Sequence, residues 1–156
     1  MVRFVPPSAG AVAEVRAAVA LFLAPGLSND VRGAVLLALD EVITNAVAHS
    51  GTEDTIEVNV SREGERVMAT VRDSGTGFDP QRIRHDSPPA PQAEGGRGLY
   101  IAIQLMDSVT VYSDRGTIVH MSCGSEERDK LARPSRTYAS ECIVRFAHPP
   151  AAAALA

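Results

Sequence analysis

The chain has 156 residues, of which 45% are hydrophobic and 22% charged, and this composition is typical of one soluble globular domain with its own core. The formal net charge of −4 gives no overall attraction to nucleic acid or to an anionic membrane, and no apolar run is long enough to cross a bilayer. Because the two cysteines lack metal-ligand spacing and the N-terminus lacks the layout of a secretory signal, we expect a cytoplasmic protein with reduced thiols.

Two patterns of hydrophobic residues recur along the chain. Apolar residues at helical spacing predict helices over 11–23, 28–49 and 99–106. Alternating apolar and polar residues predict strands over 2–5, 55–61, 66–72, 109–113 and 117–122. Because short turns join neighbouring strands, we expect an α+β fold: a two-layer α/β sandwich whose mixed or antiparallel sheet has helices on one face.

The segments between and after these elements suggest the domain organisation. Residues 73–98 are rich in proline and glycine, and a loop of that length in a compact domain favours a functional role. The charged stretch 124–138 is typical of a linker or a frayed end, whereas 141–147 has the composition of one further strand. We therefore expect a domain over 1–123 and a partly disordered extension over 124–156.

A polar stripe interrupts the helix expected over 28–49, which Ser28 or Asn29 can cap at its start and Gly51 can close at its end. Glu41 and Asn45 lie one turn apart on the border of its apolar face. An amide oxygen together with phosphate oxygens can hold a magnesium ion, and a carboxylate one turn away can orient or deprotonate a nucleophile. Taken alone, the stripe is better explained as a solvated helix edge, and only the downstream motifs favour a site.

Two glycine-rich segments follow. In DSGTG at 73–77 the carboxylate of Asp73 can accept a hydrogen bond from an exocyclic amine, although a simple strand-ending turn also fits. In EGGRGL at 94–99 glycine backbone runs into a helix start and can approach phosphate, with Arg97 as an added charge, although a hinge also fits. In this order the three segments indicate one nucleotide pocket, which is neither a P-loop nor a dinucleotide-binding fold.

Four stretches carry a resemblance to a known family: EVITNAVAH at 41–49, DSGTGFDP at 73–80, GGRGLYIAIQLMDSV at 95–109 and GTIV at 116–119. They resemble the N box, the two glycine boxes and the final strand of the gyrase, chaperone and histidine-kinase (GHKL) ATPase superfamily. Within it, the small size and the third block look most like the anti-sigma-factor serine/threonine kinases of the RsbW and SpoIIAB type. The resemblance implies an α/β sandwich that binds Mg-ATP.

The resemblance also implies roles for individual residues. Asn45 would be the magnesium ligand, Glu41 the general base, and Asp73 the contact to the adenine amino group. The expected surroundings of the nucleotide are Gly75 and Gly77 at the base, Thr117 near Asp73 and the adenine, Gly95, Gly96, Arg97 and Gly98 at the phosphates, and a lid over 78–98.

The function implied by the resemblance is that of an anti-sigma factor. Such a protein sequesters a sigma factor and phosphorylates a small STAS-type anti-anti-sigma protein on Ser or Thr, and a homodimer is a further expectation. The alternative is an ATP-responsive protein-binding module without useful kinase activity. A detached histidine-kinase ATP domain is disfavoured, because no helix bearing a phosphoacceptor histidine precedes the domain.

Overall fold

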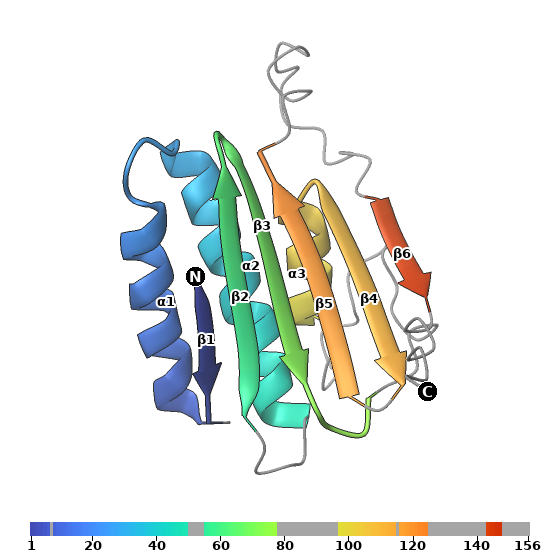
Figure 1. Cartoon of the computed structure of the whole chain (residues 1–156). Helices are drawn as coiled ribbons and strands as arrows, with labels where there is room; N and C mark the ends of the chain where they lie inside the picture. The colour runs from blue at the N-terminus through green and yellow to red at the C-terminus, as the bar shows by residue number, and fades with distance from the viewer. Residues whose placement is uncertain (7, 50–54, 78–96, 115, 125–142, 148–156) are drawn as a thin grey trace, which may run out of the picture.

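The computed structural model describes the chain except for residues 7, 50–54, 78–96, 115, 125–142 and 148–156, and it has two layers (Figure 1). One layer is a sheet with the strand order β1-β2-β3-β5-β4-β6. Its strands are β1 (Val2–Val5), β2 (Ile56–Glu63), β3 (Arg66–Asp73), β4 (Ser108–Asp114), β5 (Gly116–Cys123) and β6 (Ile143–Ala147). The other layer contains the helices α1 (Ala9–Leu23), α2 (Asn29–His49) and α3 (Arg97–Leu105). The expected α+β sandwich with helices on one face is confirmed.

The sheet buries one side of each central strand against the helices. Ile56, Val58 and Val60 of β2 are fully buried, and the residues between them are more exposed. Val67 and Val71 of β3 continue the same inner face. Because successive side chains of a strand point to opposite faces, this alternation leaves the other face of the sheet open to solvent.

The sheet is mixed because of its last strand. The pairs from β1 to β4 are antiparallel, whereas β6 joins β4 in parallel, with Ile143 opposite Ser108. β6 lies inside the 141–147 segment, and residues 125–142 and 148–156 of the extension lie outside the described part of the chain. None of the helices in the described ranges combines the length and the apolar content that a bilayer crossing needs.

The hydrogen bonds at the start of α2 show which of the two candidates, Ser28 or Asn29, caps the helix. The backbone amide of Val31 donates a hydrogen bond to Ser28 Oγ at 3.3 Å, so Ser28 is the cap. Asn29 is instead the first helical residue, and its Oδ1 accepts a hydrogen bond from Arg32 Nη2 at 2.9 Å. From this start the helical period carries Val35, Leu39, Val42, Ile43 and Ala46 into the core. The expected close at Gly51 lies outside the described residues.

Arg62 of β2 ties the helical layer to the sheet. Its guanidinium donates hydrogen bonds to the carbonyl oxygens of Pro25 and Gly26, which lie in the connection between α1 and α2. Its Nε donates to the carbonyl of Gly64 at 2.7 Å, in the β2–β3 turn. One side chain therefore satisfies three backbone acceptors in two connections that are far apart in sequence.

Candidate functional site

Glu41 and Asn45 lie in the carboxyl-terminal half of α2, one turn apart. Both are half-buried at the border of the apolar face of the helix. Neither side chain makes a hydrogen bond or an ion pair with another residue in the described ranges. Half-buried polar groups without protein partners are available to a ligand or to water, which is the arrangement that a binding site needs.

The first turn of α3 packs directly against these two side chains. A Cβ placed on Gly98 would lie 2.8 Å from Asn45 Nδ2 and 2.8 Å from Glu41 Oε2, which is closer than ordinary van der Waals contact. The helix begins at Arg97, two residues before the predicted start at 99, because the close contact with α2 outweighs the poor helix propensity of glycine. The stripe on α2 and the glycine-rich segment before α3 therefore meet in space.

Asp73, the last residue of β3, is a buried carboxylate with 9% of its surface exposed. Its Oδ1 accepts hydrogen bonds from the backbone amides of Gly75 at 2.9 Å and Thr117 at 3.2 Å. The bond to Gly75 is that of a strand-ending turn closed by an aspartate side chain. The second carboxylate oxygen has no partner among the described residues, so the turn also presents a free acceptor.

Two glycines shape the backbone around Asp73. Gly116, at the start of β5, has a φ of 98°, and a Cβ there would overlap the carbonyl oxygen of Asp73. Gly77 has a φ of 71°, also in the left-handed region that favours glycine. From the sequence alone, residue 116 is a glycine between the strands expected over 109–113 and 117–122 and the first residue of the GTIV block. The glycine directly before a strand was the available signal that backbone approaches closely there.

The structure gathers these groups at one edge of the molecule. Figure 1 shows the carboxyl ends of α2 and β3 at the same edge as the amino end of β5. α2 packs against α3, and the contact with Gly98 shows that Glu41 and Asn45 lie on the side of α2 that faces α3. Of the predicted site residues, Gly95 and Gly96 lie outside the described part of the chain, as does the lid apart from Arg97 and Gly98.

The chemistry of this edge fits a magnesium-bound nucleotide. The free oxygen of Asp73 is a buried acceptor, and the glycine at position 98 leaves room that a side chain would fill. Among the described residues no three His, Cys, Asp or Glu side chains cluster in a way that could hold a metal. A magnesium ion at Asn45 would therefore need oxygen ligands from phosphates and water, which magnesium commonly accepts.

Residues 5–123 match the family model described as the histidine kinase-like ATPase domain, so the chain belongs to that family. This confirms the family-level resemblance of the sequence motifs. The match covers β2 to β5 and the three helices α1 to α3, reaches only the last residue of β1, and leaves β6 outside.

Within the family the similarity extends to RsbW proteins. The chain is 28% identical over 130 residues to the serine-protein kinase RsbW of Staphylococcus aureus strain JH9, covering 76% of this chain and 82% of that protein, and equally similar to the protein of strain Newman. The solved structure of the RsbU and RsbW domains of Rv1364c from Mycobacterium tuberculosis superposes with a TM-score of 0.61 and 22% identity. That match covers 87% of this chain and 33% of the solved one. The blue-light activated histidine kinase of Erythrobacter litoralis EL346 superposes with a TM-score of 0.53 and 20% identity, covering 78% of this chain and 43% of that one. These superpositions confirm the fold.

Proposed function

We propose that this chain binds Mg-ATP at the edge formed by α2, β3 and α3, and that it is an anti-sigma-factor serine/threonine kinase. Its substrate would be a small STAS-type anti-anti-sigma protein, and it would sequester a sigma factor. The observation that carries the proposal is the close packing of Gly98 against Glu41 and Asn45, because it joins two of the three motifs at one place. Membership in the histidine kinase-like ATPase family and the similarity to RsbW serine-protein kinases support it.

The residue roles in this proposal follow the chemistry of each group. Asn45 would hold magnesium, and Asp73 would accept a hydrogen bond from the adenine amino group. Glu41 would accept the proton of the attacking Ser or Thr hydroxyl. When bound, ATP would supply the phosphoryl group and magnesium would neutralise part of the phosphate charge. The remaining contacts would come from Gly75, Gly77 and Thr117 around the base and from Gly95, Gly96, Arg97 and Gly98 around the phosphates.

Calorimetry with ATP, in the presence and in the absence of magnesium, tests the nucleotide part of the proposal. The parent chain is expected to bind in a magnesium-dependent manner, and Asn45→Ala is expected to lose that dependence while staying folded. Asn29→Ala is the matched control, because Asn29 lies at the opposite end of α2. No heat and no thermal shift at millimolar Mg-ATP would dispose of the proposed nucleotide site.

Capture of partners from the native cell, with and without ATP, tests the protein part. Recovery of a sigma factor or of a small STAS-type protein, together with labelling of that protein from γ-labelled ATP, supports the kinase. ATP-dependent recovery of a partner that never becomes labelled would instead favour an ATP-responsive binding module. In that second outcome Glu41 has no role as a base.

A further inference from the structure

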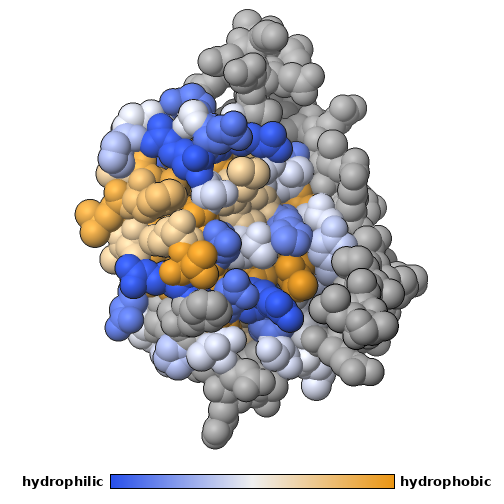
Figure 2. Space-filling model, in the orientation of Figure 1, coloured by the Kyte–Doolittle hydropathy of each residue, from blue (hydrophilic) through white to orange (hydrophobic). Residues whose placement is uncertain are grey.

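The face of the sheet that the helices leave open contains a groove of about 360 Å³. Figure 2 looks onto this face, where hydrophobic surface gathers toward α1 and β1 and the side of β4 and β5 is mostly hydrophilic or neutral. The groove is lined by two adjacent rows of side chains that cross four strands in register. One row is Asn59, Thr70, His120 and Thr110, and the other is Ser61, Met68, Ser122 and Ser108.

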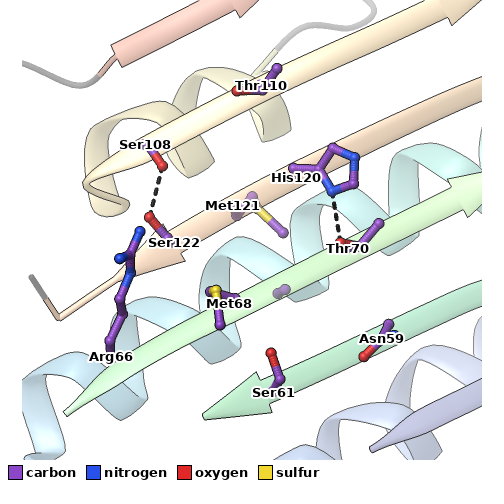
Figure 3. A pocket seen from close by; sticks show the side chains of 11 residues that line it. Asn59, Ser61, Arg66, Met68, Thr70, Ser108, Thr110, His120, Met121 and Ser122 are labelled. Atoms are coloured by element: carbon purple, nitrogen blue, oxygen red, sulfur yellow. Dashed lines mark hydrogen bonds between the residues drawn. The ribbon is translucent and has the colours of Figure 1, made fainter. Parts of the chain in front are cut away.

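Hydrogen bonds hold several of these side chains in place. Thr70 Oγ1 and His120 Nδ1 are 2.8 Å apart, and Ser108 Oγ and Ser122 Oγ are 2.7 Å apart (Figure 3). The ring of Tyr112 packs edge-on against that of His120, with centroids 5.5 Å apart. Each pair can form a further hydrogen bond. In the first pair the free atom is Nε2 of the imidazole, and in the second it is the hydroxyl proton of the serine that accepts the bond from the other. The groove therefore presents polar atoms whose positions are set before any ligand arrives.

The charge of the groove differs from that of the whole chain. Arg66 is the one charged residue among the described lining residues, and none of these residues carries a carboxylate, although the chain has a net charge of −4. Within the described chain the guanidinium of Arg66 makes no ion pair or hydrogen bond, although Glu63 lies opposite Arg66 in the β2–β3 ladder. Burial lowers the pKa of His120, so the guanidinium is the principal positive charge here at neutral pH.

We propose that this groove binds a small organic anion that carries a phosphate or a carboxylate group. The anionic group would lie between the guanidinium of Arg66 and the Ser108–Ser122 hydroxyl pair, toward which Arg66 extends in Figure 3. Guanidinium groups bind both kinds of anion through two parallel hydrogen bonds, and a nearby hydroxyl can add a third. The body of the ligand would cover Met68, which is 38% exposed, and reach His120.

The proposed ligand site is separate from the nucleotide site. Asp73 lies three residues after Thr70 on β3, so its side chain is on the helix-covered face and that of Thr70 is on the open face. Met68 therefore reports on the groove alone. Met106 is buried in the core, does not line the groove and serves as the internal reference.

Methionine-methyl NMR of the full chain, titrated separately with inorganic phosphate and with citrate, tests the proposal. The Met68 signal is expected to shift saturably with at least one probe, and the probe that shifts it identifies phosphate or carboxylate as the recognised group. Arg66→Gln is expected to weaken binding about tenfold, as the loss of a charge-assisted hydrogen bond predicts. Arg72→Gln is the matched control, because Arg72 is exposed on the same strand and does not line the groove.

Three results would overturn the proposal. The first is a Met68 signal that stays unchanged with both probes up to about 10 mM. The second is an equal loss of affinity in Arg66→Gln and Arg72→Gln, which would indicate unspecific attraction of anions. The third is a Met68 signal that changes with protein concentration in the absence of a probe, because a second copy of the chain would then occupy the groove.

Discussion

The backbone amide of Thr117 donates a hydrogen bond to the carboxylate of Asp73 at 3.2 Å, across 44 positions of sequence. The two residues are direct partners in the β3–β5 ladder, so the sheet itself sets the position of the carboxylate. One oxygen is used by the backbone and the other is left for a ligand. Asp73 therefore stabilises the fold through one carboxylate oxygen and can bind a ligand through the other.

Asp73→Asn is expected to weaken Mg-ATP binding about tenfold or more while the protein stays folded. The amide oxygen can still accept both backbone hydrogen bonds, without the charge of the carboxylate, so we expect a loss of only about 1–2 kcal/mol in the free energy of unfolding. Its NH2 group would face the adenine amine with a donor where the parent has an acceptor. Calorimetry and urea unfolding measure the two effects, with Glu65→Gln on the exposed β2–β3 turn as the control. Parent-like affinity in Asp73→Asn would contradict the adenine contact.

Gly98→Ala is expected to lower ATP affinity about tenfold with little effect on stability. The added methyl group would displace Asn45 Nδ2 and Glu41 Oε2, which are the ends of flexible side chains and can move. The gain in helix propensity, about 1 kcal/mol, offsets part of the cost of that movement. Gly33→Ala is the matched control, because nothing lies within 4 Å of its Cβ position on α2. It should stabilise the fold by about 0.5–1 kcal/mol and leave affinity unchanged. Equal affinities in the two variants would contradict the site geometry.

Arg62→Ala is expected to lower the free energy of unfolding by about 1–2 kcal/mol, because three backbone carbonyls lose their donor and the site is partly exposed to water. Chemical denaturation measures the change. The exposed Arg72→Ala should stay within about 0.5 kcal/mol of the parent. The same loss in both variants would show that the tie between the two connections contributes nothing specific.

The stability of the fold is expected to depend on the protonation of His120. Burial lowers the pKa of His120 in the folded chain below its ordinary value of 6.5, so the unfolded chain binds the proton more readily. The contribution of His120 is therefore complete above about pH 6.5 and is lost as the pH falls through the lowered pKa of the folded state. Between about pH 7.5 and about pH 5 the free energy of unfolding should decrease more in the parent than in His120→Gln. A parent-like slope in His120→Gln would contradict the linkage.

Much of the fold was predictable because the core has a clear period. The alternation of Ile56, Val58 and Val60 predicted β2, and the helical spacing of Leu39, Val42 and Ile43 predicted the buried face of α2. The observed ends of the elements differ from the predicted ones where tertiary contacts determine them. α3 begins two residues early at its contact with α2, and the parallel pairing of β6 with β4 has no counterpart in any local pattern.

The candidate site was predictable in part, since its motifs are local. The pairing of Asp73 with Thr117 and the contact of Gly98 with Asn45 come from the packing of distant segments. The groove of the open sheet face was not predictable. Serine and threonine alternating along strands are typical of any solvated sheet face, and only the register places Thr70 beside His120.

The most direct test of the nucleotide site is NMR of the isotope-labelled chain with Mn-ATP in place of Mg-ATP. Paramagnetic manganese broadens the signals of nearby nuclei, so the amides of Asn45 and Gly98 should broaden most. The amide of Gly75 should shift with Mg-ATP, and the amide of Gly64, in the β2–β3 turn at the other end of β3 from Asp73, should be little affected by either. Broadening centred on the open face, or no selective broadening at all, would contradict a nucleotide site between α2, β3 and α3.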